Sequence, residues 1–325
     1  MRVIIAGASG FIGGNLSSYL ADEGFEIVAI CHKNKPNDLE WEEKMFRVLA
    51  MDVTSYNSMS DLDEFNTDAI INLVSLNQYD SNNDPDIISK VNINPTWNFL
   101  DYFSKRGLKK YIYLSTIHIY GHDLTDDITE LSPTLPKNQY GLTHLISEQI
   151  TDYFHRTTDV DSYNIRLSNG FGSPKFTNND CWELVVNNLC LSAWESGSLI
   201  LNSDGTPLRD FFHIENLSLG IKKLLLGDKN PITKNLNTIN FSSGVTISML
   251  DAAIIVRDVY EEIYNKSLNI YINKKKRLTE FNMSSSANYT INNDLYLKLV
   301  QGEKIIDFKS GIKKVFNFLE KSVSK

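Results

Sequence analysis

Cysteines are few in this sequence, and none has the spacing that a cysteine-based site requires. The three cysteines are Cys31, Cys181 and Cys190. Their number is odd and no two of them form a Cys-x-x-Cys pair, which argues against a disulfide framework and against a structural zinc site. We therefore predict no metal site in this protein.

Long basic runs and long apolar runs are also absent. The 325 residues include 32 basic and 40 acidic side chains, for a net charge of −8. Proteins that bind nucleic acids cluster lysine and arginine against phosphates, so no nucleic-acid partner is expected. The apolar run within residues 1–7 is too short for a signal-peptide core or a membrane span. We predict a cytoplasmic protein without a membrane partner, in which a compact basic pocket for one anionic ligand remains possible.

What the sequence does contain is a regular alternation of strand and helix patterns. Short β-branched apolar runs alternate with segments whose apolar residues recur at helical spacing. Strands are expected at 3–6, 26–31, 46–51, 69–74, 111–115 and 162–167, and helices at 11–23, 86–105 and 139–156. Such alternation requires right-handed crossovers and predicts an α/β fold, a Rossmann-type doubly wound parallel sheet.

The alternation of strand and helix patterns becomes less regular after residue 171, where loops rich in Asn, Ser, Pro and Gly appear. One further strand is expected at 237–242, and helices at 246–264 and 311–321. We predict a dinucleotide-binding domain over 1–170 that returns near 206–245. Residues 171–205 and 246–325 are expected to form a smaller, interleaved substrate-binding lobe.

A glycine-rich loop joins the first strand to the first helix. Residues 7–13 read Gly-Ala-Ser-Gly-Phe-Ile-Gly. The first glycine permits the tight turn, the second lets the backbone approach a pyrophosphate, and the third allows close helix–strand packing. The helix N-terminus then offers free N–H groups to the phosphates. The expected cofactor contacts here are Gly7, Ser9, Gly10, Phe11, Ile12 and Gly13.

The end of the second strand bears on which dinucleotide is bound. NAD-binding versions of this unit usually place an acid there for the ribose hydroxyls. Here the strand ends in Cys31, His32 and Lys33, so a 2′-phosphate would be favoured and NADP(H) is predicted over NAD(H), which stays possible. His32 and Lys33 could equally belong to a solvated loop. Asp52 and Val53 are placed to meet the adenine, although Asp52 could instead cap the next helix.

The motifs together resemble the extended short-chain dehydrogenases, a family of nucleotide-sugar epimerases, dehydratases and reductases. The family's Gly-x-x-Gly-x-x-Gly loop is matched at residues 7–13, and its strand-five signature at 114–121. Its Tyr-x-x-x-Lys motif is matched at Tyr140 and broken at His144. The Arg-x-x-Asn-x-Tyr/Phe-Gly stretch is matched at 166–172, and a segment that helps hold the sugar nucleotide at 205–214.

This resemblance implies hydride transfer assisted by Tyr140 and Thr116. The Tyr140 phenol would give or take the proton while the Thr116 hydroxyl hydrogen-bonds the same oxygen. The family's lysine binds the nicotinamide ribose and lowers the tyrosine pKa, and His144 occupies its position. A neutral imidazole gives one ribose hydrogen bond and little electrostatic help. Because a reductase needs a protonated phenol, this departure favours ketone reduction; alternatively His144 is an ordinary helix-face histidine in an enzyme of altered activity.

Other positions bear on the reaction and the substrate. Dehydratases of the family carry an Asp-Glu pair directly after the catalytic threonine, and Ile117 and His118 stand there instead. His118 is a candidate substrate contact or a structural residue. Arg209 suits a substrate diphosphate, or a salt bridge with a neighbouring acid. Asn169 could donate to the same diphosphate or cap a turn.

The sequence thus predicts an NADPH-dependent reductase of a nucleotide-linked keto-sugar, acting at C4 of a 4-keto-6-deoxy sugar in surface-polysaccharide precursor synthesis. An NAD-dependent nucleotide-sugar 4-epimerase is the nearest alternative, and a non-catalytic dinucleotide-binding protein is an alternative of another class. The resemblance also implies a homodimer built on the helices at 86–105 and 139–156.

Overall fold

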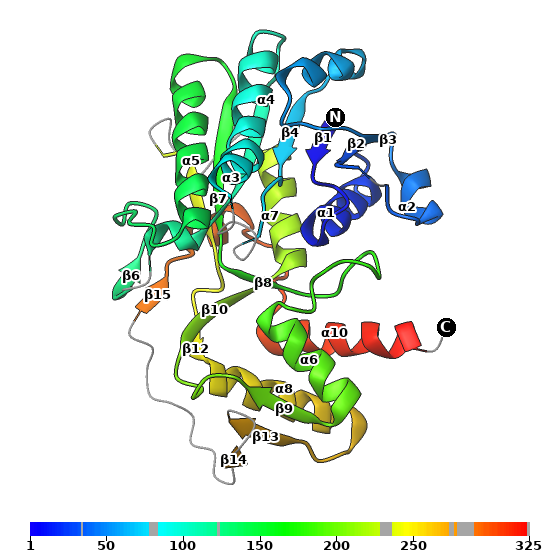
Figure 1. Ribbon diagram of the computed structural model, residues 1–325, viewed down its shortest axis with the longest axis vertical. Helices are drawn as coiled ribbons and strands as arrows, with labels where there is room; N and C mark the ends of the chain where they lie inside the picture. Colours follow the sequence, from blue (N-terminus) through cyan, green and yellow to red (C-terminus); the bar gives the residue numbers. More distant parts are fainter. Residues whose placement is uncertain are drawn as a thin grey trace.

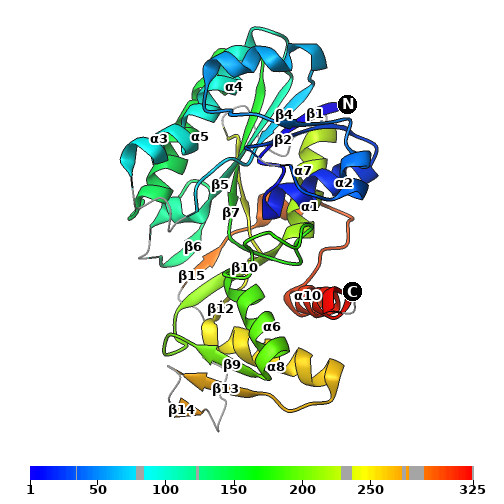
Figure 2. The same ribbon diagram turned by 45° about the vertical axis from the view of Figure 1, so that its right-hand side comes forward.

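The computed structural model describes residues 1–33, 35–77, 84–121, 124–227, 236–272, 276–277 and 289–323. A large parallel sheet with helices on both sides forms the upper part of the molecule in Figure 1, and a smaller helical part lies below it. Figure 2 shows the same two parts turned by 45° about the vertical axis, with the C-terminal helix α10 beside the lower one.

The central sheet has seven strands in the order β11-β7-β5-β4-β1-β2-β3, and every neighbouring pair in it is parallel. Its strands are β1 (Arg2–Ala6), β2 (Glu26–Cys31), β3 (Arg47–Ala50), β4 (Ala69–Asn72), β5 (Lys110–Thr116), β7 (Asp161–Leu167) and β11 (Thr238–Phe241). The Rossmann-type α/β fold predicted from the sequence is therefore confirmed. The carboxyl ends of these strands meet at one edge, where open α/β sheets bind their ligands.

Alternate residues of each strand supply two separate cores, as the pleat requires. In β1, Val3 and Ile5 join the core beneath the helices α1 and α7, while Ile4 and Ala6 join the core beneath α4 and α5. The first face is covered by α1 (Phe11–Asp22), α2 (Leu39–Lys44), α7 (Ile214–Leu226) and α9 (Asp294–Leu299). The opposite face is covered by η1 (Tyr56–Phe65), α3 (Pro85–Asn92), α4 (Asn94–Ser104) and α5 (Gln139–Thr157).

Two predicted helices are wrong in their extent. The helix expected over 86–105 is two helices, because α3 ends before Ile93 and Pro95 stands in the first turn of α4. Proline lacks the N–H that a continuous helix would use. The helix expected from residue 246 begins at 249, because residues 246–248 form a strand that pairs antiparallel with residues 208–210.

The smaller part has its own apolar core, built on α6 (Val185–Ser196), α8 (Met249–Tyr264) and α10 (Phe308–Val323). Its strands are β9 (Ser198–Leu201), β13 (Asn269–Ile272) and β14 (Lys276–Arg277). A second three-stranded sheet consists of β8 (Asn169–Phe171), β10 (Leu208–His213) and β12 (Thr246–Ser248). The remaining elements are η3 (Ile117–Tyr120) and the paired strands β6 (Asp126–Ile128) and β15 (Tyr289–Ile291).

No helix in the part of the chain that the structure describes combines the length and the apolar character needed to cross a membrane. The predicted domain boundaries stay a prediction, although α7 and β11 pack with the central sheet and α6, α8 and α10 share the second core.

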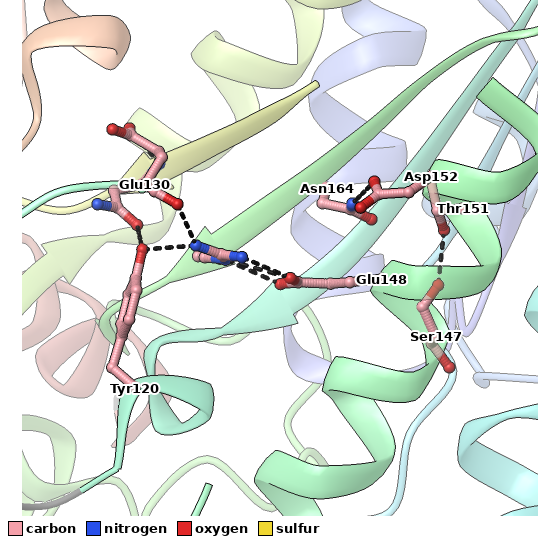
Figure 3. Close-up of polar contacts among 9 residues, drawn as sticks. Tyr120, Glu130, Ser147, Glu148, Thr151, Asp152 and Asn164 are labelled. Carbon is pink, nitrogen blue, oxygen red and sulfur yellow. Dashed lines mark hydrogen bonds and ion pairs between the residues drawn. The ribbon is translucent and has the colours of Figure 1, made fainter. Parts of the chain in front are cut away.

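A buried ion pair fastens α5 to the central sheet (Figure 3). Arg166 of β7 and Glu148 of α5 approach to 2.7 Å, with side chains only 8% and 1% exposed. Arg166 also donates to the hydroxyl of Tyr120 and to the carbonyl of Glu130. Tyr120 in turn donates to Asn240 of β11 at 2.7 Å. Tyr120, Glu130 and Glu148 thus meet at the Arg166 guanidinium group, and Tyr120 extends the network to β11.

Because the pair is buried, we expect Glu148→Gln to lower the free energy of unfolding by about 3 kcal/mol, since Arg166 would keep its charge without a counter-charge. The matched control is Glu262→Gln, which removes a carboxylate that pairs with Lys309 and Lys313 at the surface. Denaturant titration should resolve a loss for the first variant and none for the control. Two equal, small changes would show that the Arg166 network does not fasten α5.

Candidate functional site

The glycine loop has the close packing that a phosphate cradle needs. Gly7 adopts a φ of +87°, a region that favours glycine. A Cβ at Gly13 would stand 2.1 Å from the carbonyl oxygen of Gly7, so no side chain fits there. Gly10 is the N-cap of α1 and provides no side-chain cap. The first N–H groups of α1 therefore remain available to an anion.

Two cavities of about 310 Å³ each meet at this loop. We name them the tyrosine cavity and the β2–β3 cavity. Both are lined by Gly7, Gly10, Leu73, Ser75 and Leu76. The tyrosine cavity adds Phe11, Ile12, Gly13, Asn77, Leu114, Ser115, Thr116, Tyr140, His144, Leu167, Ser168, Asp180 and Leu184. The β2–β3 cavity adds Ser9, Ile30, Cys31, His32, Met51, Asp52, Val53, Thr54, Val74 and Val91.

The joined cavities fit an extended dinucleotide. The glycine loop lies where they meet, which is where a pyrophosphate would sit, and each cavity offers room on one side of it. Ser115, which lines the tyrosine cavity, has a buried hydroxyl without a hydrogen-bond partner among the described residues. An unpaired buried hydroxyl is costly unless a ligand or water satisfies it.

The β2–β3 cavity contains most of the residues predicted for the adenosine half. His32, Asp52 and Val53 line it together with Ser9 of the glycine loop, whereas Lys33 is exposed and is not part of its wall. Asp52 accepts hydrogen bonds from the N–H and the hydroxyl of Thr54, which hold the pKa of its carboxyl below the ordinary value. The cavity therefore keeps one negative charge although β2 itself ends without an acid.

Tyr140 is placed by the start of α5. Asn138 caps this helix by accepting from the N–H of Gly141 at 2.7 Å. A Cβ at Gly141 would stand 2.7 Å from the carbonyl oxygen of His118, so glycine allows the helix to approach η3 closely. Burial raises the pKa of Tyr140 to about 12, and a hydrogen bond with Thr116 offsets this only in part. The phenol is therefore protonated at neutral pH.

His144 lies one turn further along α5 and is 2% exposed. Its ring packs against the Tyr140 ring with centroids 4.4 Å apart. Its Nδ1 is 2.8 Å from the Tyr113 hydroxyl and its Nε2 is 3.1 Å from Ser75 Oγ. Burial, with a smaller effect of His118, lowers its pKa to about 3. His144 is thus a neutral side chain, and no lysine or arginine is among the described residues that line the tyrosine cavity.

The residues predicted to bind substrate lie outside both cavity walls. His118 packs edge-on against Tyr140, with ring centroids 5.7 Å apart. Asn169 donates from Nδ2 to the carbonyl of Asp210 at 2.7 Å. Arg209 is exposed and donates to the carbonyl of its neighbour Leu208. The substrate roles of His118, Asn169 and Arg209 therefore stay predictions.

Several cavity residues were not anticipated from the sequence. Ser75 follows β4 at the carboxyl edge of the sheet, and the general location of ligands in such sheets could have pointed to it. Ser168 stands at a variable position of the motif at 166–172, and Asp180 and Leu184 come from the segment after it, which offers no recognisable motif. This segment reaches the glycine loop through Asn179, whose Nδ2 donates to the carbonyl of Ser9 at 2.9 Å.

Comparison with known proteins assigns the family. The model of the NAD-dependent epimerase/dehydratase family matches residues 3–237, which is most of the chain. The chain belongs to this family. The resemblance to the extended short-chain dehydrogenases and the expectation of an NAD(P)-dependent enzyme are thereby confirmed.

Relatives within the family include nucleotide-sugar enzymes. A UDP-glucose 4-epimerase of Bacillus subtilis is 26% identical over 273 residues, which cover 77% of this chain and 80% of the relative. A low-salt glycan biosynthesis protein of Haloferax volcanii is 23% identical over 259 residues, which cover 77% and 80%.

Solved structures share the fold over the full length. The UDP-glucose 4-epimerase of Thermotoga maritima, solved with UDP-glucose, superposes with a TM-score of 0.81 at 16% identity, covering 99% of this chain and 100% of that one. The UDP-glucuronic acid 4-epimerase of Bacillus cereus, solved with NAD, gives a TM-score of 0.78 at 21% identity, covering 99% of both chains.

The low pKa of His144 predicts a specific loss of stability in acid. An unfolded histidine binds a proton near pH 6.5, whereas folded His144 does so only near its pKa of about 3. Between these values the unfolded chain binds more protons, so stability falls as pH falls. His213, with a pKa lowered by burial to about 4, acts in the same direction.

We expect His144→Gln, which can still accept and donate a hydrogen bond, to remove the contribution of His144. The difference in unfolding free energy between wild type and variant should shrink by about 1.4 kcal/mol per pH unit on going from about pH 6 to pH 4. Urea titrations across this range measure it. Parallel pH curves for the two proteins would mean that His144 is not held neutral in the fold.

Proposed function

We propose that this family member is a reductase of a nucleotide-linked keto-sugar, acting at a C4 ketone in surface-polysaccharide precursor synthesis. The observation that carries the proposal is that Tyr140 packs against the buried His144 in a cavity whose described lining contains no lysine or arginine. The family membership supports a nucleotide-sugar substrate.

The proposed direction of the reaction follows from whether Tyr140 can donate or accept a proton. Oxidation of a sugar hydroxyl needs tyrosinate as the base, and a phenol with a pKa of about 12 supplies almost none at neutral pH. Reduction needs a proton donor, which is the form that Tyr140 already has. A neighbouring cation would favour tyrosinate, but His144 is neutral.

In the proposed reaction, a bound reduced nicotinamide would supply the hydride for the ketone carbon. Tyr140 donates its proton to the ketone oxygen as the carbon–oxygen double bond becomes a single bond. Thr116 donates a hydrogen bond to the same oxygen, which stabilises the negative charge that develops there. Solvent returns a proton to Tyr140 afterwards.

The dinucleotide is NAD(H) or NADP(H). The B. cereus relative was solved with NAD, which favours NADH. The end of β2 favours NADPH, because His32 and Lys33 replace the usual ribose-binding acid and both side chains are exposed at the β2–β3 cavity or beside it. We propose NADPH as the preferred hydride donor. Faster turnover with NADH than with NADPH would contradict this choice.

Arg209 is proposed to meet the substrate diphosphate, assisted by Asn169 and His118. The exposed guanidinium of Arg209 uses Nη1 on a neighbouring carbonyl, which leaves further donors of its fork for an anion. Asn169 uses Nδ2 on the carbonyl of Asp210, and His118 lies against Tyr140.

A second candidate is a nucleotide-sugar 4-epimerase, which the names of several relatives favour. Such an enzyme oxidises and re-reduces the same carbon, so it needs a tightly held oxidised dinucleotide and an accessible tyrosinate. Protein that purifies with bound NAD and interconverts UDP-glucose and UDP-galactose would support this candidate over the reductase.

The proposed homodimer would use the face formed by α4 and α5. Trp97 and Tyr153 stack with centroids 6.3 Å apart and are 46% and 49% exposed. Leu142 and Ile146 of α5 are exposed as well. Apolar side chains grouped on one helical face are typical of an interface, and a sedimentation mass of twice 37.0 kDa would agree with it.

The test of the proposed function is oxidation of NADPH and NADH in the presence of GDP-, CDP-, dTDP- and UDP-linked 4-keto-6-deoxy sugars. We expect protein-dependent loss of absorbance with one nucleotide and faster turnover with NADPH. Tyr140→Phe should lower kcat at least about 100-fold, the effect of removing a general acid, while the dinucleotide still binds.

The matched control is Tyr153→Phe, which changes an exposed tyrosine on the same helix and should leave kcat unchanged. If no sugar of the panel causes loss of NADPH or NADH absorbance, although the dinucleotide binds, the proposed reductase activity is contradicted. Full activity of Tyr140→Phe would show that Tyr140 is not the proton donor.

A further inference from the structure

The position that holds a lysine in the Tyr-x-x-x-Lys motif is occupied here by one member of a three-residue hydrogen-bond chain. Tyr113 of β5, His144 of α5 and Ser75 after β4 form it, with separations of 2.8 Å and 3.1 Å. Three different elements of the central fold therefore meet at the His144 ring. Ser75 is the member that lines both the tyrosine cavity and the β2–β3 cavity.

The direction of each hydrogen bond in the chain can be deduced. Ser75 Oγ is 2.8 Å from the carbonyl oxygen of Leu76, which can only accept, so the Ser75 hydroxyl donates its proton there. Ser75 must then accept from His144, which places the imidazole proton on Nε2. Nδ1 is left as an acceptor, and the Tyr113 hydroxyl donates to it.

This arrangement uses both nitrogens of His144 inside the protein. His144 therefore has no hydrogen bond to offer a ligand without breaking the chain. Ser75 Oγ, in contrast, has two lone pairs and uses one of them on His144. The free acceptor belongs to a partly buried hydroxyl in the wall shared by the two cavities.

We propose that Ser75, rather than His144, binds the ribose next to the nicotinamide, by accepting a hydrogen bond from a ribose hydroxyl. The location supports this, because Ser75 lies in the shared wall with Gly7 and Gly10, and through His144 it is linked to Tyr140. The ribose between pyrophosphate and nicotinamide has to pass this place. His144 and Tyr113 are positioning residues that fix the orientation of the Ser75 hydroxyl.

The inference rests on the dinucleotide binding included in the proposed function, but it does not depend on the direction of the reaction. Its test compares the dissociation constants of NADH, ADP-ribose and ADP, measured by calorimetry on the full chain. NADH and ADP-ribose contain the second ribose, and ADP lacks it.

We expect Ser75→Ala to weaken the binding of NADH and ADP-ribose about tenfold, roughly the contribution of one hydrogen bond, and to leave ADP unchanged. Tyr113→Phe removes the donor that selects the tautomer and should act in the same direction by a smaller factor. Ser60→Ala, at an exposed serine that bonds only within its own turn, is the matched control and should alter none of the three constants.

Ser115→Ala tests the competing assignment that Ser115 binds the ribose, because Ser115 also lines the tyrosine cavity and its hydroxyl has no hydrogen-bond partner among the described residues. A loss with Ser115→Ala and none with Ser75→Ala would overturn the assignment. So would equal losses for ADP and ADP-ribose in Ser75→Ala, which would indicate a general disturbance of the cleft. Wild-type protein that binds none of the three ligands and does not bind NADPH would overturn both this inference and the proposed function, whereas binding without reductase activity overturns only the latter.

Discussion

The buried ion pair between Arg166 and Glu148 is the interaction on which the site depends. It fixes α5 against β7, and the same guanidinium reaches Tyr120 at the end of η3. Tyr140, His144 and Glu148 follow one another at intervals of four residues and so share one face of α5. When Glu148 is held, the other two are held as well. The position of Tyr140 relative to Thr116 therefore depends on an ion pair two turns away, together with the Asn138 cap at the start of α5.

In this arrangement the Arg166–Glu148 ion pair lies apart from the Tyr140 hydroxyl that is proposed to react. Glu148 of α5 is paired with Arg166 of β7, whereas His144, which lines the tyrosine cavity from the same helix, is neutral. Around Tyr140, burial dominates and raises the phenol pKa to about 12. A site with this balance favours proton donation over proton abstraction, which connects the packing of α5 to the proposed direction of reaction.

Much of the fold could be predicted from sequence because local patterns decide it. The glycine loop, the buried strands and the end of the first helix are each encoded within a few residues. The split between α3 and α4 was missed because apolar spacing continues across Ile93, even though Pro95 prevents a continuous helix. Residues 246–248 were assigned to a helix because their strand exists only through pairing with β10.

The candidate site likewise contains some residues that the sequence identifies and others that only the structure brings to attention. Tyr140, Thr116 and the glycine loop stand in recognisable motifs, and the structure places them in one cavity wall. The state of His144 could not be predicted, because its burial and its partners come from Tyr113 and Ser75, 31 and 69 residues away. Ser75 itself carries no motif. Its importance follows only from where β4 ends and which side chains meet there.

Tyr140 is a protonated donor in this account, and the described residues that line its cavity include no lysine or arginine. This claim is tested most directly by the ionisation of Tyr140, followed by NMR of protein labelled with 13C at tyrosine Cζ, with Tyr140→Phe assigning the resonance among the 15 tyrosines. We expect that the Tyr140 resonance does not titrate below about pH 10. A titration centred near about pH 7 would contradict it, because the site would then hold a tyrosinate suited to oxidation.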